Sequence, residues 1–165
     1  MIIDYMKTGL NKYTFSNRKI FEWTMKYSRG LILNLFAGKT LLSLTEIRND
    51  ADENMPADYH LDALEFVKTW NKDKFDTVIL DPPYSYRKSM EFYNGNKASK
   101  FNQVKDNLPG ILNENGIVIT FGYHSVSMGQ KRNFTQERIL LMSHGGAIHD
   151  TIAVVERKTN GNTET

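Results

Sequence analysis

The sequence predicts an α/β fold, with a mostly parallel sheet that ends in an antiparallel edge strand and is covered by helices. Apolar, β-branched runs alternate with segments of helical periodicity, which is the pattern of successive β–α–β units. The last two runs instead follow each other across His144-Gly145-Gly146, as in an antiparallel hairpin. The 165 residues suffice for one compact domain, expected over residues 1–158 and followed by a flexible tail at 159–165.

Composition narrows the class of protein. The absence of cysteine excludes disulfides, thiolate zinc sites and a cysteine nucleophile, and the four histidines lack metal-ligand spacing, so no metal site is expected. No apolar run approaches the ~18 residues of a membrane helix, and Met1 to Asp4 do not begin a signal peptide. We therefore expect a soluble, cytoplasmic protein without a membrane partner. The net charge of +2 does not by itself indicate nucleic acid.

The periodicity places the elements along the chain. The expected strands are 31–35, 42–47, 58–64, 77–81, 117–121, 137–142 and 151–156, and the expected helices are 17–27, 64–70 and 98–113. Residues 1–16 carry little pattern. Ser16 is the expected N-cap of the first helix, and Pro109 predicts a kink or an early end of the last one. The step from Thr40 to the second strand is too short for a crossover helix, so that unit is abbreviated or the strand begins later.

The most informative stretch is the strand ending at Asp81 and the Pro82-Pro83-Tyr84 sequence after it. Two prolines cannot donate to a sheet ladder, so the strand must stop there. Each proline fixes its own φ, and Pro82 also restricts Asp81, so the turn is stiff before any ligand binds. The result is a rigid ledge at the carboxyl end of a central strand, where open α/β sheets bind ligands.

This ledge suits an exocyclic amine on a planar base. Asp81 and the Pro82 carbonyl can accept the hydrogens of the amine, and Tyr84 can stack on the base, which contributes ~1–3 kcal/mol. The alternative is a plain strand followed by a Pro-Pro turn, with Tyr84 serving only in packing.

Asp81-Pro82-Pro83-Tyr84 resembles motif IV, the D/N/S-P-P-Y/F signature of amino-group methyltransferases that use S-adenosylmethionine. The resemblance covers roughly residues 31–125, and weakly the closing hairpin, and implies a Rossmann-like three-layer methyltransferase fold. A separate target-recognition domain is not expected, because 165 residues leave no room for a large one. It implies transfer of a methyl group to N6 of adenine or N4 of cytosine in DNA, or to adenine N6 or guanine N2 in RNA. The Asp form is more similar to the adenine enzymes, so adenine N6 in DNA is the favoured target.

The resemblance also implies residues that bind the cofactor. The turn after the first strand is similar to motif I, F-x-G-x-G, although Thr40 replaces its second glycine; a P-loop is disfavoured because Leu33 stands where its first glycine is required. An acidic residue after the second strand would hold the ribose hydroxyls, with Glu46 as the alternative to Asp50. The cofactor-binding residues implied are Asn34, Phe36, Ala37, Gly38, Asp50, Asp62, Ala63 and Asp81, where Asp62 would accept a hydrogen bond from the adenine amine. Tyr13-Thr14-Phe15 is a candidate for motif X, although packing is the favoured role.

Basic and aromatic residues follow the ledge. From Arg87 to Lys105 there are five basic residues and one acidic residue among aromatic side chains, which suits a nucleic-acid strand but equally an ordinary solvated loop. Tyr84, Tyr86, Arg87 and Lys88 are the expected substrate contacts. His124 lies at a strand end, where a structural role is favoured over a substrate contact.

Three hypotheses of function remain. DNA is favoured over RNA as the partner, but a small core can also read structured RNA, or depend on a specificity partner or a homodimer. A binding module that retains the fold without turnover is the third, supported by Thr40 and the short second crossover.

Overall fold

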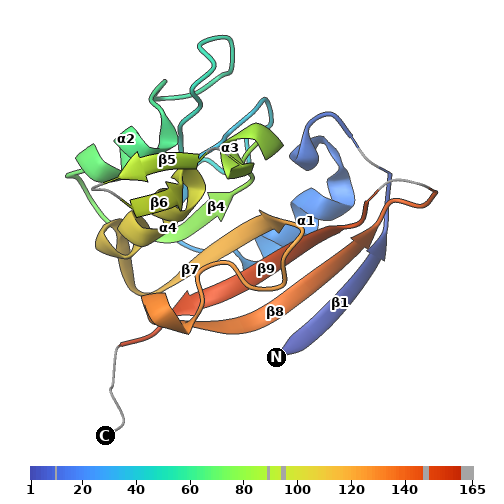
Figure 1. Ribbon diagram of the computed structural model, residues 1–165. Coiled ribbons are helices and arrows are strands. Elements are labelled where there is room, and N and C mark those ends of the chain that lie inside the picture. Colours follow the sequence, from blue (N-terminus) through green and yellow to red (C-terminus); the bar gives the residue numbers. More distant parts are fainter. Residues whose placement is uncertain (10, 89, 94–95, 147–148, 161–165) are drawn as a thin grey trace, which may run out of the picture.

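The computed structural model describes residues 1–9, 11–88, 90–93, 96–146 and 149–160; of residues 84, 88, 90–93 and 96–98 it describes the backbone alone. A seven-stranded sheet in the order β1-β8-β9-β7-β4-β2-β3 forms the centre of the molecule (Figure 1). Its strands are β1 (Ile2–Lys7), β2 (Ile32–Asn34), β3 (Glu46–Arg48), β4 (Phe75–Leu80), β7 (Leu112–Gly122), β8 (Phe134–Ser143) and β9 (Thr151–Lys158).

The strand directions confirm the predicted α/β class. β3, β2, β4 and β7 pair in parallel, whereas β9 is antiparallel to both of its neighbours, β7 and β8. The sheet continues beyond this hairpin, because the segment in which the sequence shows little pattern supplies β1, which pairs in parallel with β8. β5 (Met90–Tyr93) and β6 (Asn96–Ser99) form a separate antiparallel pair.

Helices cover both faces of the sheet, which gives the three layers. The helices are α1 (Arg18–Tyr27), α2 (Ala63–Thr69), α3 (Tyr84–Lys88) and α4 (Lys100–Ile111), with short 3-10 turns η1 (Thr14–Ser16) and η2 (Gln130–Arg132). Successive residues of a strand point to opposite faces. Val78 and Leu80 accordingly pack in a core with α2 and α4, and Ile79 packs in a second core with α1. The central strands are buried on both faces, as their continuous apolar runs predict.

Three details of the predicted elements are wrong. The N-cap of α1 is Asn17, whose side chain accepts hydrogen bonds from Lys19 N and Ile20 N; Ser16 instead donates to the Tyr13 carbonyl. The second strand begins at Glu46 and not at residue 42, as the alternative of a later start anticipated.

The third wrong detail is the strand expected over residues 58–64. It is reduced to a single bridge between Tyr59 and Asn49. Asp58 N and Tyr59 N both donate to the Arg48 carbonyl, and Asp50 N donates to the Tyr59 carbonyl, so the parallel pairing is confined to this bridge. Asp62 then caps α2 by accepting a hydrogen bond from Leu64 N, so helix replaces the end of the predicted strand.

Two glycines allow a matched test of the fold. Gly30 has a φ of +56°, and a Cβ there would lie 2.0 Å from Asp76 Oδ2, the atom that accepts the Leu31 N–H. Gly110 lies in α4 with nothing within 4 Å of such a Cβ. We expect Gly30→Ala to destabilise the protein by about 2 kcal/mol or more, and Gly110→Ala to stabilise it by about 0.5–1 kcal/mol, in urea denaturation. Equal effects of the two substitutions would contradict this account of Gly30.

Candidate active site

The carboxyl ends of β2, β3 and β4 open onto a cavity of about 450 Å³. Parallel strands present their carboxyl ends at one edge of a sheet, so residues distant in sequence meet there. Most of the cofactor-binding residues inferred from the sequence line this cavity: Phe36, Ala37, Gly38, Asp50, Asp62, Ala63 and Asp81. Pro82, Pro83 and Tyr86 also line it. The side chains of Tyr84 and Lys88 lie outside the described residues.

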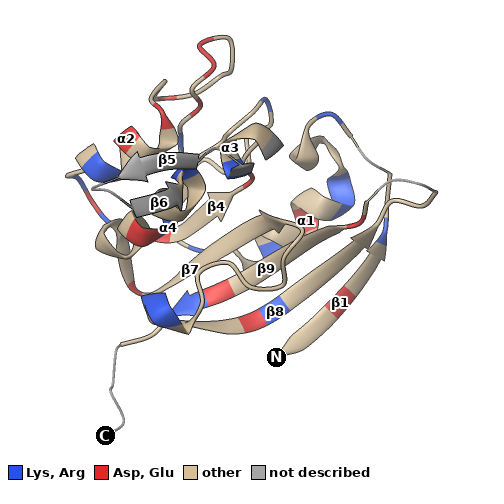
Figure 2. Ribbon diagram, in the orientation of Figure 1, with Lys and Arg blue, Asp and Glu red and all other residues tan. Residues whose placement is uncertain are grey.

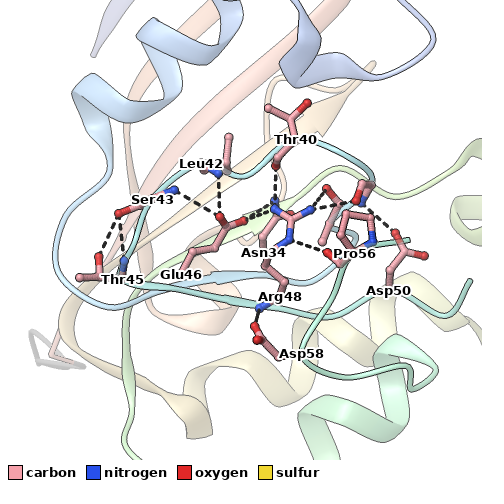
Figure 3. A network of polar contacts seen from close by, with 12 residues as sticks. Asn34, Thr40, Leu42, Ser43, Thr45, Glu46, Arg48, Asp50, Pro56 and Asp58 are labelled. Atoms are coloured by element: carbon pink, nitrogen blue, oxygen red, sulfur yellow. Dashed lines mark hydrogen bonds and ion pairs between the residues drawn. The ribbon is translucent and has the colours of Figure 1, made fainter. Parts of the chain in front are cut away.

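One wall of the cavity is the loop between β2 and β3, which has no helix of its own and is held by Arg48 (Figure 3). The Arg48 guanidinium has five N–H donors, and each meets an acceptor. Nη1 donates to the Thr40 carbonyl at 2.6 Å and to Glu46 Oε1 at 2.8 Å. Nη2 donates to the Ala37 and Gly38 carbonyls at 3.2 and 2.8 Å, and Nε donates to the Pro56 carbonyl at 2.8 Å.

Glu46 completes this network from the same strand. Its side chain is fully buried and accepts hydrogen bonds from Leu42 N, Ser43 N and Asn34 Nδ2 in addition to Arg48. A ribose contact by Glu46, the alternative to Asp50, is therefore wrong, because both carboxylate oxygens point into the protein. Asn34 is likewise fully buried and does not line the cavity; its side chain donates to Glu46, and its carbonyl accepts the N–H of Asn49, which does line it.

Asp50 joins the loop after β3 to the motif I turn. Its Oδ2 accepts the Gly38 N–H at 2.8 Å, and its Oδ1 accepts the Asp52 N–H at 3.0 Å. Gly38 has a φ of +58°, which glycine adopts without steric cost. Asp50 and Asp52 both line the cavity, and the loop that contains them is acidic (Figure 2). Carboxylates in this position can accept hydrogen bonds from hydroxyl groups of a ligand.

Asp62 lies across the cavity at the start of α2. Its Oδ1 caps Leu64 N, and its Oδ2 lies 3.1 Å from Lys100 Nζ of α4. The Tyr86 hydroxyl accepts the same Leu64 N–H at 3.2 Å, and its ring packs edge-on against Phe36 at 5.2 Å. Tyr86, expected to contact substrate, thus lies between the motif I turn and α2.

The ledge has the form that its sequence predicts. β4 ends at Leu80, and Asp81-Pro82-Pro83 leads directly into α3, whose Tyr86 N and Arg87 N both donate to the Pro83 carbonyl. The Asp81 side chain is 21% exposed and lines the cavity. Burial raises the pKa of this carboxyl above its usual range, and a hydrogen bond from the Thr14 side chain and the charge of Arg87 oppose the shift.

The N-terminal segment contributes more residues to the cavity wall than the sequence predicts. Tyr13, Thr14 and Phe15 all line the cavity, and Phe15 also packs edge-on against Phe121 at 5.3 Å. Packing, the favoured role, therefore holds for Phe15, whereas Thr14 reaches Asp81. The sequence signal for this placement was the short motif X resemblance alone.

A second cavity of about 260 Å³ lies beside the first, where β7 ends. Arg87 and His124 line it, and Arg87 Nη2 is 3.8 Å from Asp81 Oδ1 of the first cavity. His124 is exposed and does not serve as a structural core residue. Within the described ranges, no group of three or more His, Asp or Glu residues is placed to hold a metal ion, and no helix has the length and apolar character to cross a bilayer.

No protein-family model matches the chain, and no curated protein sequence matches it. Solved structures do match. The N-methyltransferase NodS from Bradyrhizobium japonicum WM9 aligns with a TM-score of 0.60 at 12% identity, over 92% of this chain and all of the NodS chain. TrmN from Thermus thermophilus aligns with a TM-score of 0.56 at 13% identity, over 85% of this chain and 47% of its own.

A third structure is the tRNA (uracil-54, C5)-methyltransferase of Pyrococcus abyssi in complex with S-adenosyl-L-homocysteine. It aligns with a TM-score of 0.51 at 11% identity, over 91% of this chain and 40% of its own. Identities this low establish the architecture and not the substrate. The chain has the Rossmann-like fold of these methyltransferases, with a mostly parallel sheet between helical layers.

Proposed function

We propose that the protein is an S-adenosylmethionine-dependent methyltransferase acting on an exocyclic base amine of nucleic acid, with N6 of adenine in DNA as the favoured target. One observation carries the proposal: the Asp81-Pro82-Pro83 ledge opens into the same cavity as the motif I turn, Asp50 and Asp62. Similar solved structures are methyltransferases, one of them bound to S-adenosyl-L-homocysteine.

The polar groups of the cavity suit the cofactor. Its volume of about 450 Å³ lies within the range of small-molecule sites. Asp50 and Asp52 would accept from the ribose hydroxyls, and Asp62 would accept from the adenine amine. The backbone of Phe36 to Gly38 would follow the methionine end.

The protein's part in the reaction is orientation. S-adenosylmethionine supplies an electrophilic methyl group, so no covalent enzyme intermediate is required. Asp81 and the Pro82 carbonyl would accept the two hydrogens of the target amine and thereby direct its nitrogen lone pair at the methyl group. The proximity of the two reactants supplies much of the acceleration. A base stacked in a duplex cannot reach this ledge, so the target must be flipped out or single-stranded, with Tyr84 proposed to stack on it.

RNA is the second candidate substrate. One similar structure is a tRNA methyltransferase. Mass spectrometry of nucleosides from DNA and from RNA, each incubated with the protein and S-adenosylmethionine, distinguishes the two. N6-methyladenosine in RNA without methylated DNA would move the assignment to RNA. No methylated nucleoside in either, with cofactor bound, would favour a binding module.

The pH dependence of transfer is expected to report on Asp81. Protonation replaces an acceptor by a donor that opposes the hydrogens of the amine, so the rate should fall as the pH decreases through a pKa above the usual value of 3.8. Asp81→Asn retains an acceptor oxygen without this titration, so its slower rate should lack the acid limb. The measurement is the single-turnover rate against pH at saturating cofactor. An acid limb that persists in Asp81→Asn would assign the titration to another group.

A further inference from the structure

The second cavity is lined largely by residues that have no role in the proposed reaction at Asp81. It lies between the carboxyl end of β7 and the first turns of α4, and its wall includes Arg87, Lys105, Thr120, Gly122 and Ser127. Arg87 connects it to the first cavity, because its guanidinium lines the second while lying 3.8 Å from Asp81 in the first. Arg87 thus lies between this cavity and the carboxylate at which the target amine is proposed to bind.

Buried polar atoms without partners are concentrated here. Among the described residues five buried side-chain atoms lack a hydrogen-bond partner, and three of them belong to the wall of this cavity: Arg87 Nε, Thr120 Oγ1 and Ser127 Oγ. Arginine Nε can only donate, and each hydroxyl can donate. Since buried donors are normally satisfied, the three point to a ligand that accepts hydrogen bonds.

Lys105 adds a positive charge to the same wall. Its Nζ donates to the Ser127 carbonyl at 3.2 Å and lies 4.9 Å from the centre of the Phe101 ring. Burial is the main cause that lowers the pKa of this ammonium, to about 8, so it remains mostly charged at neutral pH.

The carboxylates near Lys105 are already paired. Asp106 pairs with Arg132, and Glu156 accepts the N–H groups of Ser127, Met128 and Gly129. Within the described part of the chain, Lys105 itself forms no ion pair. The charge of Lys105 is therefore available to a ligand.

Arg87 is the second cation of this cavity, and Gly122 leaves room for its side chain. A Cβ at this position would lie 3.2 Å from Arg87 Nη1 and 3.5 Å from its Cζ, so a larger residue would displace the guanidinium. Arg87 also lies 5.7 Å from the Tyr123 ring centre. A guanidinium presents its donors in a planar fork, which suits a phosphate or carboxylate group.

We propose that this second cavity binds a phosphate group of the methyl acceptor, held by Arg87 and Lys105 with hydrogen bonds from Thr120 and Ser127. This inference rests on the proposed function, since it names the part of the acceptor that lies beside the target amine. The acceptor is then a nucleotide, free or within a strand, and not a free base or a nucleoside. Phosphate is favoured because the available groups are two cations and hydroxyl donors in one enclosed space.

The test uses the whole protein labelled with nitrogen-15 and saturated with S-adenosylhomocysteine. Inorganic phosphate, adenosine, adenosine monophosphate and a short single-stranded oligonucleotide are titrated separately and followed by NMR. We expect phosphate to shift the amides of Thr120, Gly122 and Ser127, and the monophosphate to bind at least about tenfold more tightly than adenosine. Tighter binding of the oligonucleotide than of the monophosphate would assign the phosphate to a strand, and the reverse to a free nucleotide.

Three variants make the test specific. Lys105→Met should remove most of the preference for the monophosphate, and Thr120→Val, which deletes the hydroxyl at nearly constant shape, should weaken phosphate binding several-fold. Lys19→Met removes one positive charge from the exposed surface of α1, on the opposite face of the sheet, and should leave binding unchanged. Equal affinity for adenosine and its monophosphate, or phosphate shifts that survive in Lys105→Met, would overturn the proposal.

Calorimetry of S-adenosylhomocysteine binding separates this inference from the proposed function. If the cofactor binds and phosphate does not, the phosphate site is wrong and the methyltransferase proposal stands. If the cofactor does not bind to the unlabelled protein at all, the proposed function fails, and with it the identification of this phosphate as part of a methyl acceptor.

Discussion

Replacing Asp81 by alanine is expected to lower the rate of methyl transfer by about 10²–10³-fold, the effect typical of removing one preorganised polar group from an active site. The carboxylate stands at the carboxyl end of β4, in the wall of the large cavity, where it is proposed to hold the target amine. S-adenosylhomocysteine should still bind, at reduced affinity, because Asp50 and Asp62 remain. Single-turnover rates and calorimetric affinities measure the two effects separately.

This loss should not come from unfolding. The folded-state pKa of Asp81 is raised, so its ionised form lowers stability at any pH above that pKa, and the penalty disappears as the pH falls below the ordinary value. At neutral pH, Asp81→Ala should therefore be at least as stable as the parent protein, apart from the small loss of side-chain packing. Full activity in Asp81→Ala would contradict the role of the ledge.

Asp73→Ala is the matched control. Asp73 lies in the exposed turn before β4, outside both cavities, so its removal changes the net charge equally without touching the site. Neither the rate nor the cofactor affinity should change. A similar fall in rate for both variants would attribute the effect to charge and not to position.

The sequence predicted the fold class because the buried strands of a parallel sheet carry a strong signal. The β4 run and the prolines after it indicate both a strand and its end, and the structure confirms both. Likewise, residues at the carboxyl ends of successive strands were expected to meet, and they line one cavity. The residue types at the strand ends were therefore sufficient to predict where β4 ends and most of the cofactor-binding residues that line the cavity.

Two features could not be read from the sequence, because they depend on specific hydrogen-bond partners and not on the apolar pattern. β1 is an exposed edge strand, so its residues lack the apolar pattern, and only its pairing with β8 defines it. Residues 42–45 look like a strand by composition, but the Glu46 carboxylate takes the Leu42 and Ser43 N–H groups and turns the chain. Hydrogen bonds to the side chain of Glu46 here override local propensity.

Arg48 is the most consequential residue that sequence reasoning missed. The available signal was the pair of charged residues, Glu46 and Arg48, that flank Ile47 after an apolar run. The structure shows that its guanidinium substitutes for the absent crossover helix, since it binds three carbonyls of the motif I loop directly. Thr40, which replaces the second motif glycine, belongs to this loop. The departure from the motif and the buried arginine are therefore two parts of one arrangement.

Arg48→Met is expected to destabilise the protein by about 3–5 kcal/mol, because it leaves Glu46 as a buried charge without its partner and frees the loop carbonyls. Urea denaturation measures the loss. Where the variant remains folded, the affinity for S-adenosylhomocysteine should also fall, since the loop that forms one wall of the cavity loses its anchor. The double variant Glu46→Gln/Arg48→Met should recover part of the stability, because the uncompensated charge is gone.

Arg18→Met is the control for removing an arginine that forms an ion pair. Arg18 pairs with Glu22 on α1, but its side chain is 89% exposed, so its removal should leave stability unchanged within error. A parent-like stability of Arg48→Met would show that the buried network does not hold the loop. If the double variant is as unstable as Arg48→Met alone, the loss comes from the carbonyl contacts and not from the charge on Glu46. Arg48 would then still be the residue that shapes the cavity wall.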